Sequence, residues 1–459
     1  MAANFEHEQW SSRTAFLLAA VGTAVGLGNV WRFPFIAGVN GGGAFVIIYI
    51  VAIFAIGIPL LVGELTLGRR GQQSAIQSMR ELTAAEGRSS FWHAIGWLSI
   101  LTPLIGLIYY SVVAGWTLDY IIATARGTFE GVDASGSEAA FGSLTNDPLR
   151  MGIGHAVFVL ATVAVVARGV QKGLEKAVRV LMPFLFVILV ALVGYAAFTA
   201  DFSGALAFMF KPDFTKVNAT VVLMAIGQAF FSISVAVGAM ITYGAYMPKQ
   251  VSIPRSAIII GGTDTLVALM AGMAIFPLVL TYGLQPGEGP GLVFVTLPIA
   301  FGQMPAGLVF GALFFLLMSI AALTSTIGML EPVVSFLEEH KGFTRSTVAV
   351  LTGLFVWVTG IVIVLSFNVL SGVKPLDMFP MFKDKGIFEL FDFVTANIMI
   401  PVGGLLIALF VGWMLKPASA RDELQMPDNL TFRIWQFLVR FVAPVALVAI
   451  FVMNLMGAA

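Results

Sequence analysis

Long apolar runs dominate this chain and decide what it can fold into. A membrane-spanning α-helix needs about 20 consecutive apolar residues, and we read eleven such runs along the 459 residues. They lie near residues 14–36, 43–67, 93–123, 151–167, 177–199, 219–246, 256–283, 306–337, 347–367, 388–415 and 434–456. Because α-helices satisfy their own backbone hydrogen bonds in lipid, the runs predict an all-α polytopic membrane protein with eleven transmembrane helices.

The composition agrees with a protein embedded in a lipid bilayer. Hydrophobic residues make up 58% of the chain and charged residues only 11%, against about 25% charged residues in globular domains. The formal net charge of zero argues against a nucleic-acid partner. The absence of cysteine excludes disulfides and thiolate metal sites. The N-terminal segment MAANFEHEQWSSR is polar, and we expect no separate cleavable signal.

Lysine and arginine in the loops predict the orientation in the membrane. The basic loops cover residues 68–88, 168–179, 340–345 and 416–423. All four fall on one side, and such loops face the cytoplasm. We therefore expect a cytoplasmic N-terminus and, with eleven spans, an extracytoplasmic C-terminus in the inner (plasma) membrane. The segment KPLDMFPMFKDK (374–385) is the exception, because it carries mixed charge on the outer side.

Two of the predicted spans are interrupted by residues that weaken helices. In the first, GTAVGLGNVWRFPF (22–35) combines glycines with Asn29, Arg32 and Pro34. In the sixth, AIGQAFFSISVAVGAMITY (225–243) holds small and polar residues in mid-span. Paired breaks in corresponding spans point to a transporter built from inverted repeats, whose unwound backbone binds substrate and ions. The alternative is that the glycines only permit close helix packing.

The five-span spacing of the breaks predicts the domain organisation. The parts are 1–13, a cytoplasmic N-terminal gate segment; 14–199, the first repeat of spans one to five; 200–416, the second repeat of spans six to ten; and 417–459, a loop and span eleven. An unwound helix offers free carbonyl and N–H groups, which suit a small cation and a carboxylate respectively. The pattern favours co-transport of a small cation with a carboxylate-bearing solute.

Six motifs resemble one known family, in order along the chain. They are GTAVGLGNVWRFPF, NGGGAFVIIYI, GIPLLVGELTLGRRG, IYYSVVAGWTLDY, FFSISVAVGAMITYGAY and AALTSTIGMLEP, spread over about Trp10 to Pro401. They resemble the neurotransmitter:sodium symporter family and its bacterial sodium-dependent amino acid transporters. The resemblance implies a 5+5 inverted repeat with broken helices one and six, alternating access, and two bound sodium ions. Ala236 departs from the glycine often found in the sixth-span break.

The resemblance also implies which residues bind the two ions. Sodium site one takes the Ala24 carbonyl, Asn29, Ser232 and the substrate carboxylate. Sodium site two takes the carbonyls of Gly22, Val25 and Ala321 with the hydroxyls of Thr324 and Ser325. The alternative role of these two hydroxyls is to bond back to the preceding helical turn.

Asp264 is an ionisable residue inside an apolar run, and such residues are functional by default. Alignment of LMAGMAIF with the family places Asp264 where an asparagine usually helps to hold the first sodium ion. Some bacterial relatives carry a glutamate four residues further on, where this chain has Ala268. We therefore expect Asp264 to supply a fixed negative charge, to remove any chloride requirement, and to bind a proton after sodium leaves. The alternative is a span-end residue that reaches water.

Other charged residues stand at positions that, by resemblance to the family, form an internal carboxylate and an outer gate. Glu64 would lie beside the broken first span and accept backbone N–H groups, with proton carriage as the alternative role. Arg32 would pair with Asp392 across the outer vestibule. Tyr110 and Phe231 would close the lid directly over the substrate.

The inner gate departs from the family pattern at one position. The residues at inner-gate positions are Trp10, Tyr246, Glu331 and Glu339. His7 stands where an arginine normally pairs with the acid at Glu339. A histidine is neutral about half the time near pH 6.5. We therefore expect a weaker or pH-sensitive gate, unless Arg13 substitutes or the register slips by one residue.

The predicted substrate site lies between the two breaks. Its residues are Thr23, Ala24, Gly26, Gly28, Gly106, Tyr110, Phe231, Ser232, Ser234, Val237, Ser325 and Met329. Gly26 stands where amine-transporting relatives place an aspartate, which favours amino acids over monoamines. Gly106 and Val237 replace larger side chains of a leucine-selective relative, and Met329 can adapt its shape. We expect neutral, bulky hydrophobic or aromatic amino acids; a small non-proteinogenic zwitterion is the alternative if helix shifts fill the space.

Other function classes fit the sequence less well. An intramembrane enzyme would need a catalytic pair or metal ligands, but the four histidines are scattered and cysteine is absent. A passive channel would not need two broken helices or paired gates. No GxxxxGK[ST] phosphate loop is present for direct coupling to ATP. We therefore expect a transporter rather than an enzyme, working as a monomer or weak dimer.

Overall fold

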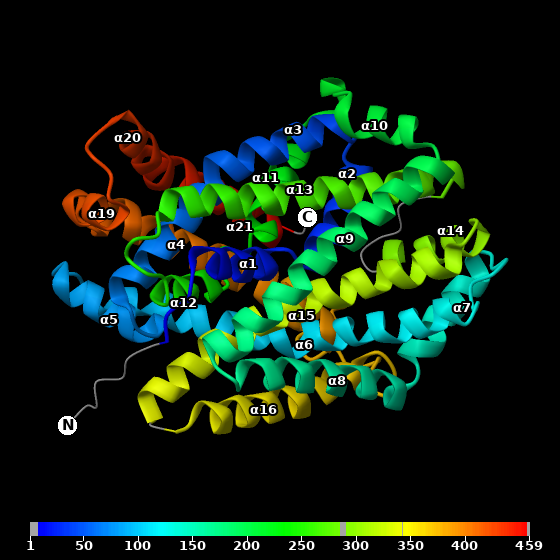
Figure 1. The fold of residues 1–459 in the computed structure, drawn as a ribbon, viewed down its shortest axis with the longest axis horizontal. Coiled ribbons are helices and arrows are strands. Elements are labelled where there is room, and N and C mark those ends of the chain that lie inside the picture. The colour runs from blue at the N-terminus through cyan, green and yellow to red at the C-terminus, as the bar shows by residue number, and fades with distance from the viewer. Residues whose placement is uncertain (1–7, 285–290, 342, 457–459) are drawn as a thin grey trace.

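The computed structural model describes residues 8–284, 291–341 and 343–456, and it contains helices and no strand in these ranges (Figure 1). Nine of the described helices are long and apolar enough to cross a membrane, and a bent pair in the first span raises that number to ten. The predicted all-α membrane architecture is therefore confirmed. The count of eleven spans stays a prediction, because the sixth consists of two pieces that are each shorter than a full span.

The first ten α-helices in chain order are α1 (Arg13–Ala24), α2 (Phe33–Val39), α3 (Gly43–Ala52), α4 (Ile58–Gly71), α5 (Ala75–Ala85), α6 (His93–Ala125), α7 (Ala134–Thr145), α8 (Pro148–Val166), α9 (Lys176–Thr199) and α10 (Phe202–Phe210). The others are α11 (Ala219–Ser232), α12 (Ala239–Ala245), α13 (Ile253–Thr281), α14 (Leu297–Gln303), α15 (Gly307–Lys341), α16 (Arg345–Ser366), α17 (Ile387–Phe393), α18 (Ile400–Leu409), α19 (Pro417–Leu424), α20 (Leu430–Phe437) and α21 (Ala443–Leu455). The longest connection that is described in full covers residues 367–386, between α16 and α17. The π-helical turn Gly28–Arg32 leads into α2, and the turn Val394–Met399 joins α17 to α18.

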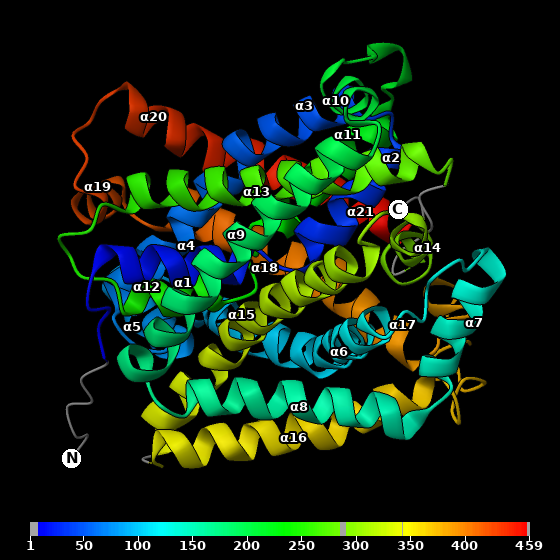
Figure 2. The ribbon, with the colours of Figure 1, turned by 45° about the vertical axis from the view of Figure 1, so that its right-hand side comes forward.

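The long helices α6 and α15 pack along each other, and α8 lies beside α16 (Figures 1 and 2). Elsewhere α12 packs so closely on α4 that a Cβ atom on Gly68 would lie 1.9 Å from the carbonyl oxygen of Ile241. Helices α5 and α19 lie at the end of the molecule where the described chain begins, and α7, α10 and α14 lie at the opposite end (Figure 2). We call these the inner end and the outer end, after the predicted orientation.

The first predicted span is broken in the structure. Helix α1 ends at Ala24, Val25 takes an extended conformation with φ −70° and ψ 100°, and helical structure resumes at Gly28. The two halves are bent by 53°. Pro34 follows the π-helical turn Gly28–Arg32 inside the resumed helix, six residues after its start, so it does not form the break. The break lies in the glycine-containing part of the motif, between Ala24 and Gly28.

The sixth predicted span is broken between α11 and α12. Ser234, Ala236 and Gly238 have φ angles of +52°, +66° and +88°, in the left-handed region that a right-handed helix excludes. The missing glycine at Ala236 thus does not prevent unwinding. In α6, Pro103 lacks the N–H that would bond to the Ser99 carbonyl. Gly238 packs on that carbonyl, and a Cβ there would lie 1.9 Å from its oxygen.

Candidate functional site

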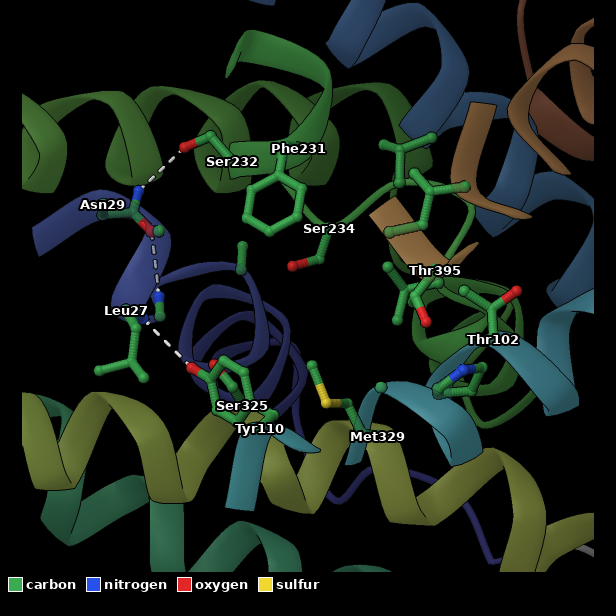
Figure 3. Close-up of a pocket in the computed structure, with 18 of the residues that line it drawn as sticks. Leu27, Asn29, Thr102, Tyr110, Phe231, Ser232, Ser234, Ser325, Met329 and Thr395 are labelled. Atoms are coloured by element: carbon green, nitrogen blue, oxygen red, sulfur yellow. Dashed lines mark hydrogen bonds between the residues drawn. The ribbon is translucent and has the colours of Figure 1, made fainter. Parts of the chain in front are cut away.

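A cavity lies between the two breaks, with further walls from α6, α15 and the start of α18 (Figure 3). The centre of a water molecule can move through about 60 Å³ of it, room for several waters at about 10–15 Å³ each. All the predicted substrate-site residues line this cavity except Thr23. The Thr23 carbonyl lies just behind the wall and accepts hydrogen bonds from the hydroxyls of Ser234 and Ser325, at 3.3 and 3.4 Å.

The first break brings backbone and hydroxyl groups to the cavity wall. The N–H of Gly26 donates to Asn29 Oδ1 at 3.0 Å, and the N–H of Leu27 donates to the Tyr110 hydroxyl at 3.2 Å. A Cβ on Gly26 would lie 2.8 Å from Ser325 Oγ and 3.1 Å from Tyr110 Oη. The position therefore has no room for a carboxylate side chain without movement of its neighbours.

Asn29, Ser232 and Asp264 form a buried polar cluster at one end of the cavity. The Asn29 amide donates to Ser232 Oγ at 3.0 Å and to Asp264 Oδ1 at 2.7 Å. Ser232 donates to Asp264 Oδ2 at 2.6 Å and accepts from the Tyr49 hydroxyl at 3.1 Å. None of the four exposes more than 2% of its surface. Asp264 therefore lies inside the helix bundle and is not a span-end residue that reaches water.

The chemistry of this cluster suits a hard monovalent cation. A buried carboxylate requires a compensating charge or strong hydrogen bonds, and only neutral groups contact Asp264 here. The side chains of Asp264, Ser232 and Asn29 offer oxygen atoms as potential ligands, although in this structure the Asn29 amide nitrogen faces the other two and its oxygen accepts the Gly26 N–H. Soft transition metals prefer sulfur or imidazole. Within the described ranges no three His, Cys, Asp or Glu side chains come together to hold a metal ion.

The end of α1 contacts α15 where the second ion is predicted. A Cβ on Gly22 would lie 3.3 Å from the Cβ of Thr324, and Val25 and Ala321 are fully buried. The Thr324 hydroxyl donates to the carbonyls of Ile320 and Ala321, at 3.2 and 3.0 Å. The Thr324 hydroxyl therefore uses its proton to bond back to the preceding helical turn, which is the alternative role given above. Its lone pairs stay available to a cation, because a hydroxyl both donates and accepts.

Glu64 ties α4 to the sixth-span break. Its Oε1 accepts the N–H of Ala236 at 2.7 Å, and the side chain is fully buried. Its Oε2 finds no hydrogen-bond partner among the described residues. The sequence analysis expected Glu64 to accept a backbone N–H beside the first break, whereas the N–H that it accepts belongs to the sixth span. One carboxylate oxygen thus fixes the left-handed segment.

The predicted ion pair at the outer end is not formed. The guanidinium carbon of Arg32 lies 4.3 Å from the ring centroid of Phe231, within the range of a cation–π contact. Although both partners are described, no nitrogen of Arg32 comes within 4.0 Å of a carboxylate oxygen of Asp392. Asp392 is exposed. Arg32 therefore contacts the ring of Phe231, and the outer end lacks the direct ion pair in this structure.

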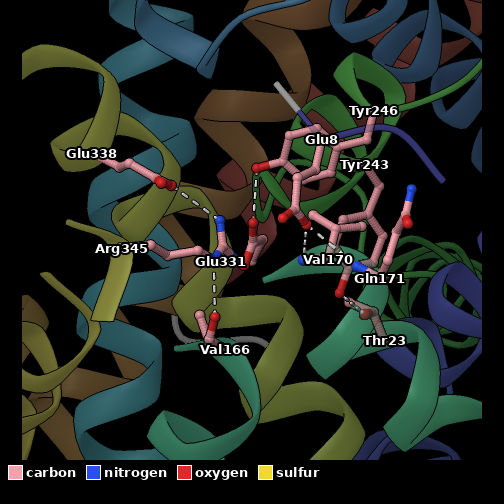
Figure 4. Close-up of polar contacts among 10 residues, drawn as sticks. All are labelled: Glu8, Thr23, Val166, Val170, Gln171, Tyr243, Tyr246, Glu331, Glu338 and Arg345. Carbon is pink, nitrogen blue, oxygen red and sulfur yellow. Dashed lines mark hydrogen bonds and ion pairs between the residues drawn. The ribbon is translucent and has the colours of Figure 1, made fainter. Parts of the chain in front are cut away.

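Trp10 closes the inner end of the molecule. It is 2% exposed, and its indole N–H and backbone N–H donate to the carbonyls of Tyr243 and Tyr246, both at 3.1 Å. The Tyr246 hydroxyl donates to Glu331 Oε1 at 2.7 Å, and the Thr23 hydroxyl donates to Tyr243 Oη at 3.2 Å (Figure 4). Three of the predicted inner-gate residues therefore belong to one network.

Arg345, at the start of α16, is an inner-gate residue that the sequence analysis missed. Its guanidinium forms one ion pair with the fully buried Glu331 and another with Glu338 at 3.2 Å (Figure 4). Its Nε also donates to the Val166 carbonyl at 2.9 Å, which ties the end of α8 to α15 and α16. The basic residues of the loop HKGFTR predicted only that this loop faces the cytoplasm. Nothing in the loop sequence identifies Glu331 as the partner of Arg345.

Two further polar contacts hold the inner end together. The backbone N–H and the hydroxyl of Ser11 donate to the two carboxylate oxygens of Glu175, each at 2.6 Å. Glu339, the fourth predicted inner-gate residue, accepts the N–H of Ser74 at 2.8 Å. His7 lies outside the described residues, so its pairing with Glu339 stays a prediction.

Part of the cavity wall was not expected from the sequence. The additional lining residues are Leu27, Thr102, Pro103, Tyr109, Val235, Thr395 and Ile400. Thr102 precedes Gly106 by one helical turn, so the two share a face of α6; that spacing was an available signal. Thr395 and Ile400 come from the tenth predicted span, and no local pattern shows that this span packs behind α6.

Comparisons with known proteins agree with this geometry. The sequence profile of the Sodium:neurotransmitter symporter family matches residues 7–130 and 147–459. An uncharacterised sodium-dependent transporter of Bacillus subtilis is 38% identical, with 98% of each chain covered. Another, from Methanocaldococcus jannaschii, is 30% identical over 97% of this chain and 90% of its own. A sodium-dependent nutrient amino acid transporter of Drosophila grimshawi is 25% identical over 98% of this chain and 77% of its own.

The fold also matches a solved structure. The crystal structure of MhsT in complex with L-phenylalanine is similar with a TM-score of 0.87 and 38% sequence identity, covering 98% of this chain and 100% of that chain. The family and the named relatives are transporters, which confirms that the chain is not an enzyme. It is a sodium-dependent symporter with multiple membrane-spanning helices, and it belongs to the Sodium:neurotransmitter symporter family.

Proposed function

We propose that the chain imports bulky, neutral hydrophobic or aromatic L-amino acids together with sodium. The observation that carries the proposal is one cavity that joins two broken helices, a buried carboxylate cluster and an apolar wall with a glycine at Gly106. The likeness to MhsT, which was solved with L-phenylalanine, supports an amino acid of this size.

The substrate would lie along the cavity with its polar end near Asn29 and Ser232. There the first break offers backbone groups to the substrate. The carboxylate of the substrate would complete the first cation site. The side chain would extend past Ser234 toward Met329 (Figure 3), which lies next to Gly106. A small zwitterion is the second candidate, because it would bind the same polar end but leave the wall around Met329 unfilled.

Two sodium ions would accompany the substrate. The first would bind the oxygens of Ala24, Asn29, Ser232 and Asp264 with the substrate carboxylate. The second would bind the carbonyls of Gly22, Val25 and Ala321 and the hydroxyls of Thr324 and Ser325. Two cations and a zwitterion need about one further negative charge in a site of low dielectric constant. Asp264 would supply it, which makes chloride unnecessary, and would bind a proton once sodium has left.

Transport would proceed by alternating access between the outer and inner ends. Residues 14–199 and 200–416 would be the inverted repeats, with 1–13 as the gate segment and 417–459 as the final loop and span. The N-terminus would be cytoplasmic and the C-terminus extracytoplasmic in the plasma membrane. The closed inner network around Trp10 and the unformed outer ion pair support a state that faces outward. The protein would work as a monomer or weak dimer.

Binding of labelled tryptophan and leucine to the purified protein tests the proposal. Each is measured in sodium chloride, sodium gluconate and potassium chloride. We expect binding in both sodium salts and none in potassium chloride. Loss of binding in gluconate would refute the chloride-independent role of Asp264, and absence of binding of both amino acids in sodium would refute the substrate assignment.

A further inference from the structure

Two threonines lie at the end of the cavity that is opposite the cation cluster. In Figure 3, Asn29 and Ser232 occupy one end, Met329 lies between, and Thr395 and Thr102 occupy the other. A Cβ on Gly106 would lie 3.8 Å from Thr395 Cγ2 and 4.0 Å from Met329 Sδ. The glycine therefore leaves open the passage that leads from the middle of the cavity to Thr395.

Both threonines are buried, and their hydroxyls have unused hydrogen-bonding capacity. The Thr395 hydroxyl donates to the Phe391 carbonyl at 2.8 Å, so its proton is used while its lone pairs can still accept. Thr395 lies in the π-helical turn Val394–Met399, a geometry that is frequent at functional sites. Its side chain is 3% exposed.

The hydroxyl of Thr102, like that of Thr124 near the end of the same helix, has no partner among the described residues. Ser99 and Ser111 in α6 each donate to the carbonyl four residues earlier, at 2.8 and 2.7 Å, the usual bond of such residues in a helix. Thr102 is 0% exposed and its hydroxyl finds no partner among the described residues. A buried hydroxyl without a partner is costly. Threonine uses two χ1 rotamers in helices, so its hydroxyl can exchange places with its methyl group.

Pro103, Val235 and Ile400 add apolar surface to the cavity wall. No residue that lines the cavity is charged, so a charged side-chain tip would find no counter-ion in its wall. We infer that Thr395 and Thr102 select side chains that carry a single hydrogen-bond donor at the tip of an aromatic ring, as tryptophan and tyrosine do. The inference rests on the proposed amino acid transport and names two selectivity residues within that site.

The test compares ligands that differ only in the donor. Tryptophan is paired with benzothienylalanine, in which sulfur replaces the ring N–H, and tyrosine is paired with phenylalanine. Binding is measured in sodium for the wild-type protein, for Thr395→Val and Thr102→Val, and for Thr395→Ser and Thr102→Ser, which keep the hydroxyl. Leucine, which has no donor, is the control ligand for every variant.

We expect the wild type to prefer each donor ligand by about tenfold, the size of one neutral hydrogen bond. The valine variants should reduce this preference to about twofold or less, the serine variants should keep it, and any loss of leucine affinity should be smaller than the loss of this preference. An unchanged preference in both valine variants, or an equal loss for leucine, would overturn the inference. If the wild type bound none of the amino acids in sodium, the proposed function itself would fail instead.

Discussion

Removal of the Arg345 guanidinium should open the inner end. Glu331 is fully buried and pairs with Arg345 and with the Tyr246 hydroxyl. Removing one partner of a buried ion pair costs about 3–5 kcal/mol, because the remaining charge stays buried without compensation. When the inner end opens, water can solvate the Glu331 carboxylate. The cost of the unpaired charge therefore destabilises only the closed state. At about 1.4 kcal/mol per tenfold, Arg345→Gln should shift the equilibrium toward the open state by at least about a hundredfold.

A single cysteine can report this shift, because the chain has no cysteine of its own. Ser335 lies one helical turn after Glu331 and is 1% exposed, so Ser335→Cys should react slowly with a water-soluble maleimide in the wild-type background. In the Arg345→Gln background its rate should rise about a hundredfold. Adding Glu331→Gln removes the second charge and should restore most of the protection, since replacing both partners is often neutral.

The control is the ion pair between Arg150 and Asp119, at the outer end of α8 and α6. Its Nε–Oδ1 distance is 2.5 Å, and the Arg150 side chain is 40% exposed. Exposed pairs contribute about 0–1 kcal/mol, so Arg150→Gln should leave the labelling rate unchanged. An unchanged rate in Arg345→Gln, or a rate in the double variant as high as in the single one, would refute the reasoning.

Three further changes test other features of the structure. Ala236→Gly should raise the melting temperature in a thermal scan by relieving a left-handed residue, which costs about 1–2 kcal/mol; a lower value would count against that strain. Gly68→Ala should abolish the monodisperse peak in size-exclusion chromatography, because its Cβ would meet the α12 backbone, whereas Gly262→Ala, with nothing within 4 Å, should keep it. Asp264→Asn should make substrate binding in sodium depend on added chloride; binding indifferent to chloride would contradict the proposed charge balance.

The sequence predicted the features that depend on local chemistry. Glycines marked the first break because they weaken helices wherever they occur. The apolar runs predicted the spans because a segment that crosses lipid needs about 20 apolar residues. Asn29, Ser232 and Asp264 lie far apart in sequence, and their position within family motifs, not any spacing, allowed them to be grouped as one site.

Other features depend on tertiary packing and were out of reach. Arg345 was counted as a loop charge, because its choice of Glu331 depends on how α15 and α16 meet. The contact of Arg32 with Phe231 instead of Asp392 depends on the state of the outer end, which no sequence pattern specifies. Thr395 reaches the cavity only because the tenth span packs behind α6.

The left-handed residues of the sixth span also limit how the cavity can change in evolution. Ser234 and Ala236 have positive φ angles, which β-branched residues adopt only under strain. Valine, isoleucine and threonine should therefore be excluded at both positions, although their volume alone would fit many cavities. Gly106 lies in regular helix, and a Cβ there would meet only Thr395 Cγ2 and Met329 Sδ, at the ordinary contact distances of 3.8 and 4.0 Å. New substrate preferences should therefore arise by substitution on α6, while the backbone of the break stays the same.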